Sequence, residues 1–190
     1  MDGRAARGQR NRQAVIDATL ALIGEGDLEP TAQAIARRAG VATRSVFHHF
    51  ADLESLFADV ADTQMARHWG LLRPVDGDLD ERIEQVVSQR AQLFERISAA
   101  RRSAVLREQS SAVLAERLRE SRAALRAHLR RNLPELTRLD RPTREGLEAA
   151  ASWETWEVLR RHQGLSATAA RQATARMLRL VLAGSGAVTS

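Results

Sequence analysis

A glycine between two short helical segments constrains this fold more than any other feature of the sequence. Residues 31–50 read TAQAIARRAGVATRSVFHHF, and Gly40 separates the two segments. Glycine reaches the left-handed backbone conformation without steric cost, so helices commonly end at such a residue. The apolar residues at helical spacing on either side are Ile35, Ala36, Ala39, Val41, Val46 and Phe50. This pattern predicts a helix-turn-helix, whose second helix suits the major groove of DNA.

The rest of the chain predicts an all-α fold, because apolar residues recur at helical spacing and no strand pattern is present. Thr31 is a good N-cap for the helix that ends at Gly40. We place a domain boundary after residue 51, which gives an N-terminal domain, 1–51, and a larger helical domain, 52–190. The helices expected outside the residue-40 turn cover about residues 12–23, 52–69, 143–163 and 166–183, with others between 80 and 134.

Composition and charge narrow the function classes. The chain has 190 residues and no cysteine, which excludes disulfides and thiolate metal sites and agrees with a cytoplasmic protein. No apolar run approaches the roughly 20 residues of a membrane span, so we expect no membrane partner. All 29 basic residues are arginine. Several precede the first expected helix, so residues 1–11 form either a basic, phosphate-binding arm or a solvated terminus.

Metal binding and catalysis have no support in the sequence. The five histidines lie at positions 48, 49, 68, 128 and 162, without HExxH or a well-spaced carboxylate cluster. No GxSxG and no glycine-rich phosphate loop is present. We therefore expect no metal, no cofactor and no catalytic residues.

The segment around Gly40 resembles the TetR/AcrR family of bacterial transcriptional regulators. Family members typically read GVS, two variable residues, T-L-Y, one variable residue and H-F. In this chain the matching or substituting residues are Gly40, Val41, Ser45, Val46, Phe47, His49 and Phe50. Ala42 replaces the usual capping serine, which makes Thr43 the candidate N-cap. Phe47 lacks the tyrosine hydroxyl that reaches a phosphate, and Leu53 stands where many members have a lysine.

Polar residues on the outer faces of the two helices are the candidates for DNA contact. Arg44 is the best placed to contact a guanine edge through its planar fork. Thr43, Ser45 and His49 are better placed for phosphate or mixed contacts, and Gln33 for fixing the register on the backbone. The full candidate set is Thr31, Gln33, Thr43, Arg44, Ser45, Phe47, His48 and His49.

The resemblance implies a C-terminal domain that binds a small effector and forms a homodimer. It places an effector pocket among the helices from about residue 52 to 163, where the candidate lining residues are Trp69, Phe94, Arg102, Gln109, His128 and Trp153. It also places the last two long helices in the dimer interface. The apolar residues expected there are Trp156, Leu159, Ala170, Ala173, Met177, Leu180 and Val181. By the alternative interpretation, the tryptophans are simply core anchors.

The resemblance therefore implies a ligand-responsive repressor that binds a palindromic double-stranded operator as a dimer. A second hypothesis is a helical small-molecule-binding protein of the same fold that has lost specific DNA binding, which Phe47 and Leu53 favour. A third, an enzyme built on a helical bundle, requires a cluster of titratable groups that the sequence does not indicate.

Overall fold

The computed structural model describes residues 2–184, with side chains from residue 5 onwards. Helices and the turns between them make up this part of the chain, and none of its residues is in a strand. The α-helices are α1 (Asp2–Gly24), α2 (Ala32–Ala39), α3 (Thr43–His49), α4 (Leu53–His68), α5 (Leu79–Arg107), α6 (Ala112–Asn132), α7 (Arg141–Ala150), α8 (Trp153–Glu157) and α9 (Ala167–Gly184). Two 3-10 helices and a π-helix complete the order: η1 (Trp69–Leu71), η2 (Pro134–Arg138) and η3 (Val158–His162).

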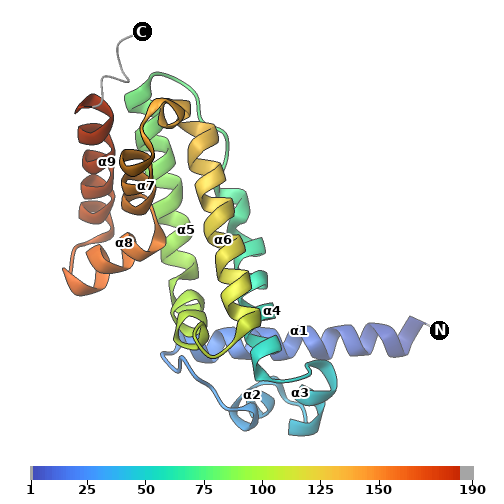
Figure 1. Cartoon of the computed structure of the whole chain (residues 1–190). Coiled ribbons are helices and arrows are strands. Elements are labelled where there is room, and N and C mark those ends of the chain that lie inside the picture. The colour runs from blue at the N-terminus through green and yellow to red at the C-terminus, as the bar shows by residue number, and fades with distance from the viewer. Residues whose placement is uncertain (1, 185–190) are drawn as a thin grey trace. The chain divides into compact units, whose positions relative to one another are not determined.

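The first helix begins about ten residues before the expected position. Figure 1 shows α1 as one long helix that includes nearly all of residues 1–11, so the expected basic arm is helical from Asp2 onwards. Alanine and arginine have high helix propensity, and the only glycines before Gly24 are at positions 3 and 8. Arg7 and Arg10 are exposed on this helix, whereas the side chain of Arg4 lies outside the described residues.

The chain packs into two compact units. Unit 1 comprises Met1–Arg67 and Ile97–Glu120, and unit 2 comprises His68–Arg96 and Ser121–Ser190. Helices α5 and α6 therefore contribute residues to both units. The expected boundary after residue 51 describes where DNA binding should end, and it remains a prediction.

Each unit has its own apolar core. In unit 1 the buried residues come from α1 to α4 and from the parts of α5 and α6 that belong to this unit. In unit 2 they come from the other parts of α5 and α6, and from η2, α7 and α9. The principal core residues are Val15, Ile16, Ile35, Val46, Leu56, Phe57 and Leu114 in unit 1, and Ile83, Val86, Leu129, Leu133, Leu147 and Leu178 in unit 2.

The expected helix at 143–163 is broken into three pieces. It begins at Arg141 because Asp140 is the N-cap and accepts from the Thr143 backbone N–H at 2.9 Å. The chain turns after α7, and Ser152 caps a new helix by accepting from the Thr155 backbone N–H at 3.2 Å. Side-chain capping of this kind competes with continuous helix and permits the break.

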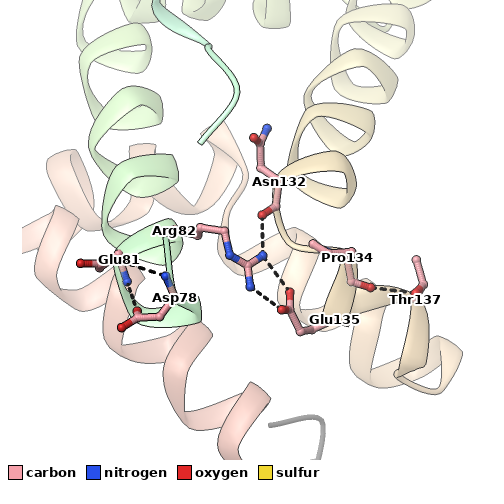
Figure 2. Close-up of polar contacts among 7 residues, drawn as sticks. All are labelled: Asp78, Glu81, Arg82, Asn132, Pro134, Glu135 and Thr137. Carbon is pink, nitrogen blue, oxygen red and sulfur yellow. Dashed lines mark hydrogen bonds and ion pairs between the residues drawn. The ribbon is translucent and has the colours of Figure 1, made fainter. Parts of the chain in front are cut away.

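A polar clasp fixes the turn that follows α6 in unit 2. Figure 2 shows Arg82 of α5 between the end of α6 and the start of η2. Its Nη1 donates to the Asn132 carbonyl oxygen at 3.0 Å, and its guanidinium pairs with Glu135. Both charged side chains are only 16% exposed. Nearby, Asp78 caps α5 by accepting from the Glu81 backbone N–H at 2.9 Å. Polar contacts therefore stabilise both the start of α5 and the end of α6 in unit 2.

Candidate nucleic-acid interface

The turn between α2 and α3 has the predicted geometry. Thr31 Oγ1 accepts from the Ala34 backbone N–H at 3.2 Å and caps α2. Gly40 adopts φ 69° and ψ 30°, the left-handed conformation expected of it. The Val41 N–H then donates to the Ala36 carbonyl oxygen at 3.0 Å, which closes the helix end. Both features of the sequence prediction, the cap and the glycine, are confirmed.

Apolar contacts hold α3 in place within unit 1. Ile35, Ala36, Val46 and Phe50 are all buried and belong to the same core as α1 and α4. Figure 1 shows α2 and α3 as two short helices that follow α1 and are joined by a tight turn. Since the buried residues occupy one face of each helix, the opposite face of α3 is left to solvent.

The outer face of α3 carries the predicted DNA-contacting side chains. Thr43, Arg44, Phe47 and His48 are exposed, and Ser45 and His49 are half-buried. Phe47 is 49% exposed, an unusual position for a large aromatic ring in water.

Arg44 places an exposed guanidinium on this face. Its side chain makes no hydrogen bond or ion pair with any residue that the structure describes. The histidine rings beside it lie 5.3 Å apart at 66°, and neither belongs to a metal-binding group in the described chain. The arrangement supplies a guanidinium and an aromatic ring that are available to base edges and phosphates.

The beginning of α3 differs from the expectation that Thr43 is the N-cap. Ala42 occupies the cap position and makes no side-chain cap bond, while the Ser45 N–H donates to the Ala42 carbonyl oxygen at 2.8 Å. Thr43 is therefore the first helical residue, and its exposed hydroxyl is not used in capping α3.

Helix α2 adds a basic residue that sequence reasoning missed. Arg37 lies one helical turn after Gln33, and both side chains are exposed. The neighbouring Arg38 pairs with Glu25, whereas Arg37 has no ion-pair partner among the described residues. The signal that could have identified Arg37 is its i, i+4 spacing from Gln33, which puts both residues on the same helix face.

The residues at the start of α4 serve capping and packing, including the leucine at the position where many TetR/AcrR members have a lysine. Asp52 is the N-cap of α4 and accepts from the Ser55 backbone N–H at 2.7 Å. This hydrogen bond lowers the pKa of Asp52. Leu53, which stands at the family's lysine position, is half-buried and packs against the core of unit 1. It is thus a packing residue here.

Ion pairs from the neighbouring helices surround α4 within unit 1. Arg12 of α1 pairs with Asp59 and lies over the Phe50 ring, 5.0 Å from its centroid. Arg117 of α6 pairs with Asp62 at 3.2 Å, although burial raises the pKa of Asp62. These contacts join α4 to the helices on either side of it.

The end of α5 contacts the segment between α1 and α2. Arg107 lies over the Phe57 ring, 3.8 Å from its centroid, and donates to the Leu28 carbonyl oxygen at 3.1 Å. Ser103 Oγ donates to the same carbonyl at 2.6 Å. The last two turns of α5 are therefore fixed to α4 and to the segment between α1 and α2 by these contacts.

Unit 2 contains a cavity of about 590 Å³ between α5, α6, α7 and α8. Its charged lining residues are Arg90, Arg122, Arg126, Arg130, Glu145, Glu148 and Glu154, and the others are Leu125, Leu129, Ala149, Ser152 and Trp153. Arg90 is buried, and its guanidinium donates to the carbonyl oxygens of Ala151, at 2.8 Å, and Leu125. Burial lowers the pKa of Arg90 to about 10, against the opposing influence of the Glu148 charge.

The six residues predicted to line a ligand pocket are not brought together at this cavity. Trp153 lines it. Phe94 is buried beside Trp156, with 6.2 Å between ring centroids, and Trp69 is half-buried in η1. Arg102 and Gln109 belong to unit 1, where Gln109 is exposed. Helix spacing alone could not select the inward arginines, because an arginine on an amphipathic helix usually faces water.

His128 is buried in unit 2 but is not among the residues lining the cavity. Burial, together with the positive charge of Arg90, lowers the pKa of His128 to about 4. The ring is therefore neutral at physiological pH.

The residues predicted at a dimer interface fall into two groups. Trp156, Leu159 and Ala170 are buried within the protomer, which leaves them little surface for a partner. Trp156 Nε1 donates to Glu95 at 3.0 Å, an internal contact. On α9, Leu180 is 62% exposed, and Ala173, Met177 and Val181 are half-buried.

Within residues 2–184, no group of three or more histidine or acidic side chains is placed to hold a metal ion. No helix in that range is both long enough and apolar enough to cross a bilayer.

Comparison with known proteins assigns the N-terminal segment. Residues 15–60 match the family model described as bacterial regulatory proteins, tetR family. That range contains α2, the Gly40 turn and α3, together with the last part of α1 and the first half of α4. No curated protein matches the sequence.

Solved structures share the fold over nearly the whole chain. A transcriptional regulator from Rhodococcus sp. Rha1 matches with a TM-score of 0.70 and 20% identity, over 93% of this chain and 96% of that one. A regulator from Pseudomonas aeruginosa matches with 0.66 and 20%, over 91% and 90%. A TetR-family regulator from Mesorhizobium loti matches with 0.63 and 18%, over 94% and 98%. The predicted fold class, an N-terminal helix-turn-helix domain followed by a helical domain, is confirmed.

Proposed function

We propose that this chain, whose residues 15–60 match the tetR family of bacterial regulatory proteins, is a repressor that binds a palindromic operator as a homodimer. A small molecule bound in unit 2 lowers the affinity for the operator. The observation that carries the proposal is the free outer face of α3, where Arg44 and Phe47 are exposed and the inner face is fixed in the core.

The chemistry of this face suits direct reading of bases. A guanidinium can donate two parallel hydrogen bonds to the O6 and N7 atoms of a guanine. An exposed phenyl ring such as that of Phe47 can contact the methyl group of a thymine. Thr43 and Arg37 supply a hydroxyl and a second cation for phosphate oxygens. We therefore assign base contacts to Arg44 and Phe47, and backbone contacts to Thr43 and Arg37.

Exposed apolar residues on α9 support a homodimer. Ala173, Met177 and Leu180 recur at helical spacing, and Leu180 is the most exposed large apolar residue in the described chain. A partner helix would cover this stripe, because water-exposed leucine gains free energy on burial. Two-fold symmetry would place two copies of α3 on half-sites about one helical turn apart.

Effector control has a route through shared helices. Helices α5 and α6 supply cavity residues in unit 2, and in unit 1 they supply Arg107, which contacts the segment before α2, and Arg117, which contacts α4. A ligand with different affinities for two arrangements of these helices would shift the population that binds DNA.

The proposal is tested by selection of duplexes from a random-sequence pool, followed by fluorescence anisotropy on the selected DNA. We expect the selected sequences to share a palindrome, and log affinity to fall linearly with log salt concentration. Arg44→Ala should lower specific affinity by about 5- to 150-fold, which corresponds to the loss of one bidentate base contact. The matched control Arg141→Ala changes an arginine whose side chain is 80% exposed on α7, and should have no effect.

The same experiment separates the alternative function, a helical binding protein without specific DNA binding. Enrichment of no sequence, or an equal loss of specific and non-specific affinity in Arg44→Ala, would contradict the repressor and favour that alternative.

A further inference from the structure

We infer that the cavity of unit 2 binds small organic anions, in which a carboxylate is carried on an apolar body, with Arg90 and Arg126 facing the negative charge. The inference deepens the proposed function, on which it rests, by naming the chemistry of the effector. Three observations support it: a buried cation with no carboxylate at hydrogen-bond distance, carboxylates that are already paired with other arginines, and an apolar remainder of the wall.

Arg90 is a buried cation without a carboxylate partner at hydrogen-bond distance. The residue is 3% exposed, its two hydrogen bonds go to the neutral carbonyl groups of Ala151 and Leu125, and its Nε atom has no acceptor. Burial of a charge that is not paired costs free energy. An anion in the adjoining cavity would offset this cost, so the position of Arg90 favours an acidic ligand over a neutral one.

Each of the three glutamates of the wall is hydrogen-bonded to an arginine other than Arg90. Glu148 accepts from Arg130 Nε at 2.6 Å and from Nη2 at 3.0 Å. Glu154 accepts from Arg122 at 2.9 Å, and Glu145 from Arg141 at 2.7 Å.

Arg126 is the second uncommitted cation of the cavity wall. It is exposed and has no ion-pair partner within the described part of the chain. It lies one residue after Leu125, whose carbonyl oxygen accepts from Arg90. The cavity wall therefore combines a buried cation, Arg90, with an exposed one, Arg126.

The remaining wall is apolar and of suitable size. Leu125, Leu129, Ala149 and Trp153 provide aliphatic and aromatic surface. A volume of about 590 Å³ lies within the range of roughly 300–1,000 Å³ that is typical of small-molecule sites. Such a wall would hold the body of the ligand, while the arginines determine its charge and orientation.

Isothermal titration calorimetry on the full chain tests the charge preference. The probes are 4-phenylbutyrate and 4-phenylbutanol, which have the same apolar body and differ in the terminal group. We expect the carboxylate to bind at least about tenfold more tightly than the alcohol, the scale of a charge-assisted hydrogen bond. Equal affinities, or the absence of binding by both compounds, would overturn the inference.

Arginine variants locate the binding site. Arg90→Met replaces the guanidinium with an unbranched apolar side chain and should abolish the preference for the carboxylate. Arg126→Gln removes the exposed charge at little risk to folding and should weaken the carboxylate by a few-fold. Arg119→Gln, an exposed arginine on the same helix but outside the cavity wall, is the matched control. A preference that survives both cavity variants, with circular dichroism showing folded protein, would contradict the assignment.

A DNA-binding measurement keeps this inference separable from the proposed function. Arg44→Ala should bind 4-phenylbutyrate as the unchanged protein does, because its substitution lies on α3. If the anion binds but no duplex is selected, the repressor proposal fails and the ligand class stands. If a duplex is selected but the carboxylate shows no preference, the ligand class fails and the repressor proposal stands.

Discussion

The outer face of α3 and the cavity wall of unit 2 both rely on arginine, but they use it in opposite ways. Arg44 is exposed and without an ion-pair partner among the described residues, so its guanidinium is free to replace counterions at a nucleic acid. In the cavity, Arg90 is held by two carbonyl oxygens, and Arg130 is held by Glu148. The residue type alone therefore does not determine the role; its partners and burial do.

The two sites also differ in how much their residues contribute to the free energy of unfolding. Exposed polar residues such as Arg44 and Thr43 contribute little to the free energy of unfolding. Groups buried in unit 2 alter it, because their desolvation must be offset by hydrogen bonds.

The largest change is expected from acid titration of His128. Its pKa is about 4 in the folded protein and about 6.5 when unfolded. Between these values the unfolded chain binds the proton and the folded one does not, so stability falls as the pH drops from 6.5 to 4. The loss from this residue is at most about 3 kcal/mol. His128→Leu should remove that part of the pH dependence in urea denaturation series, and an unchanged slope would contradict the assignment.

A smaller change is expected at the paired arginine of the cavity wall. Arg130→Met should lower the free energy of unfolding by about 2 kcal/mol, because the Glu148 carboxylate, 5% exposed, loses two charge-assisted hydrogen bonds. Arg126→Met should change it by less than about 0.5 kcal/mol, because Arg126 is exposed and without an ion-pair partner in the described residues. Equal effects in chemical denaturation would show that the pairing with Glu148 does not stabilise unit 2.

The caps of α2 and α3 provide a third test. Thr31→Ala should lower the free energy of unfolding by about 1 kcal/mol, since its hydroxyl caps α2. Thr43→Ala should be nearly neutral for stability, because Thr43 does not cap α3, yet it should weaken DNA binding at all sequences alike. Thermal unfolding and anisotropy on the same samples distinguish these roles.

The smallest change in stability is expected at Arg44. Arg44→Ala should leave the free energy of unfolding within about 0.5 kcal/mol, while specific DNA affinity falls. A large loss of stability in denaturation would mean that Arg44 serves the fold instead of the DNA interface.

The sequence predicted the N-terminal domain well because its signals are local. The Thr31 cap, the Gly40 turn and the buried face of Ile35 and Val46 depend on spacing within twenty residues. Helix α1 begins about ten residues before the predicted position, because the residues of the charged terminus favour helix.

The cavity was largely missed because it depends on long-range packing. Arg90 and Ala151 meet across sixty-one positions of sequence, and no periodic pattern marks that contact. Trp153 was identified, since a large aromatic residue on an amphipathic helix usually lies inward. Trp156 was assigned to an interface, but its indole is directed to Glu95 within the same unit.

Site-directed cleavage of selected DNA tests the central claim most directly, that α3 enters the major groove. The chain has no cysteine, so His48→Cys on α3 introduces a unique thiol to which a DNA-cleaving iron chelate can be attached. We expect cleavage at two positions about one helical turn apart within the selected palindrome. The same reagent at Arg141→Cys on α7 should give none. Absence of cleavage from α3 on DNA that the protein still binds would contradict the account.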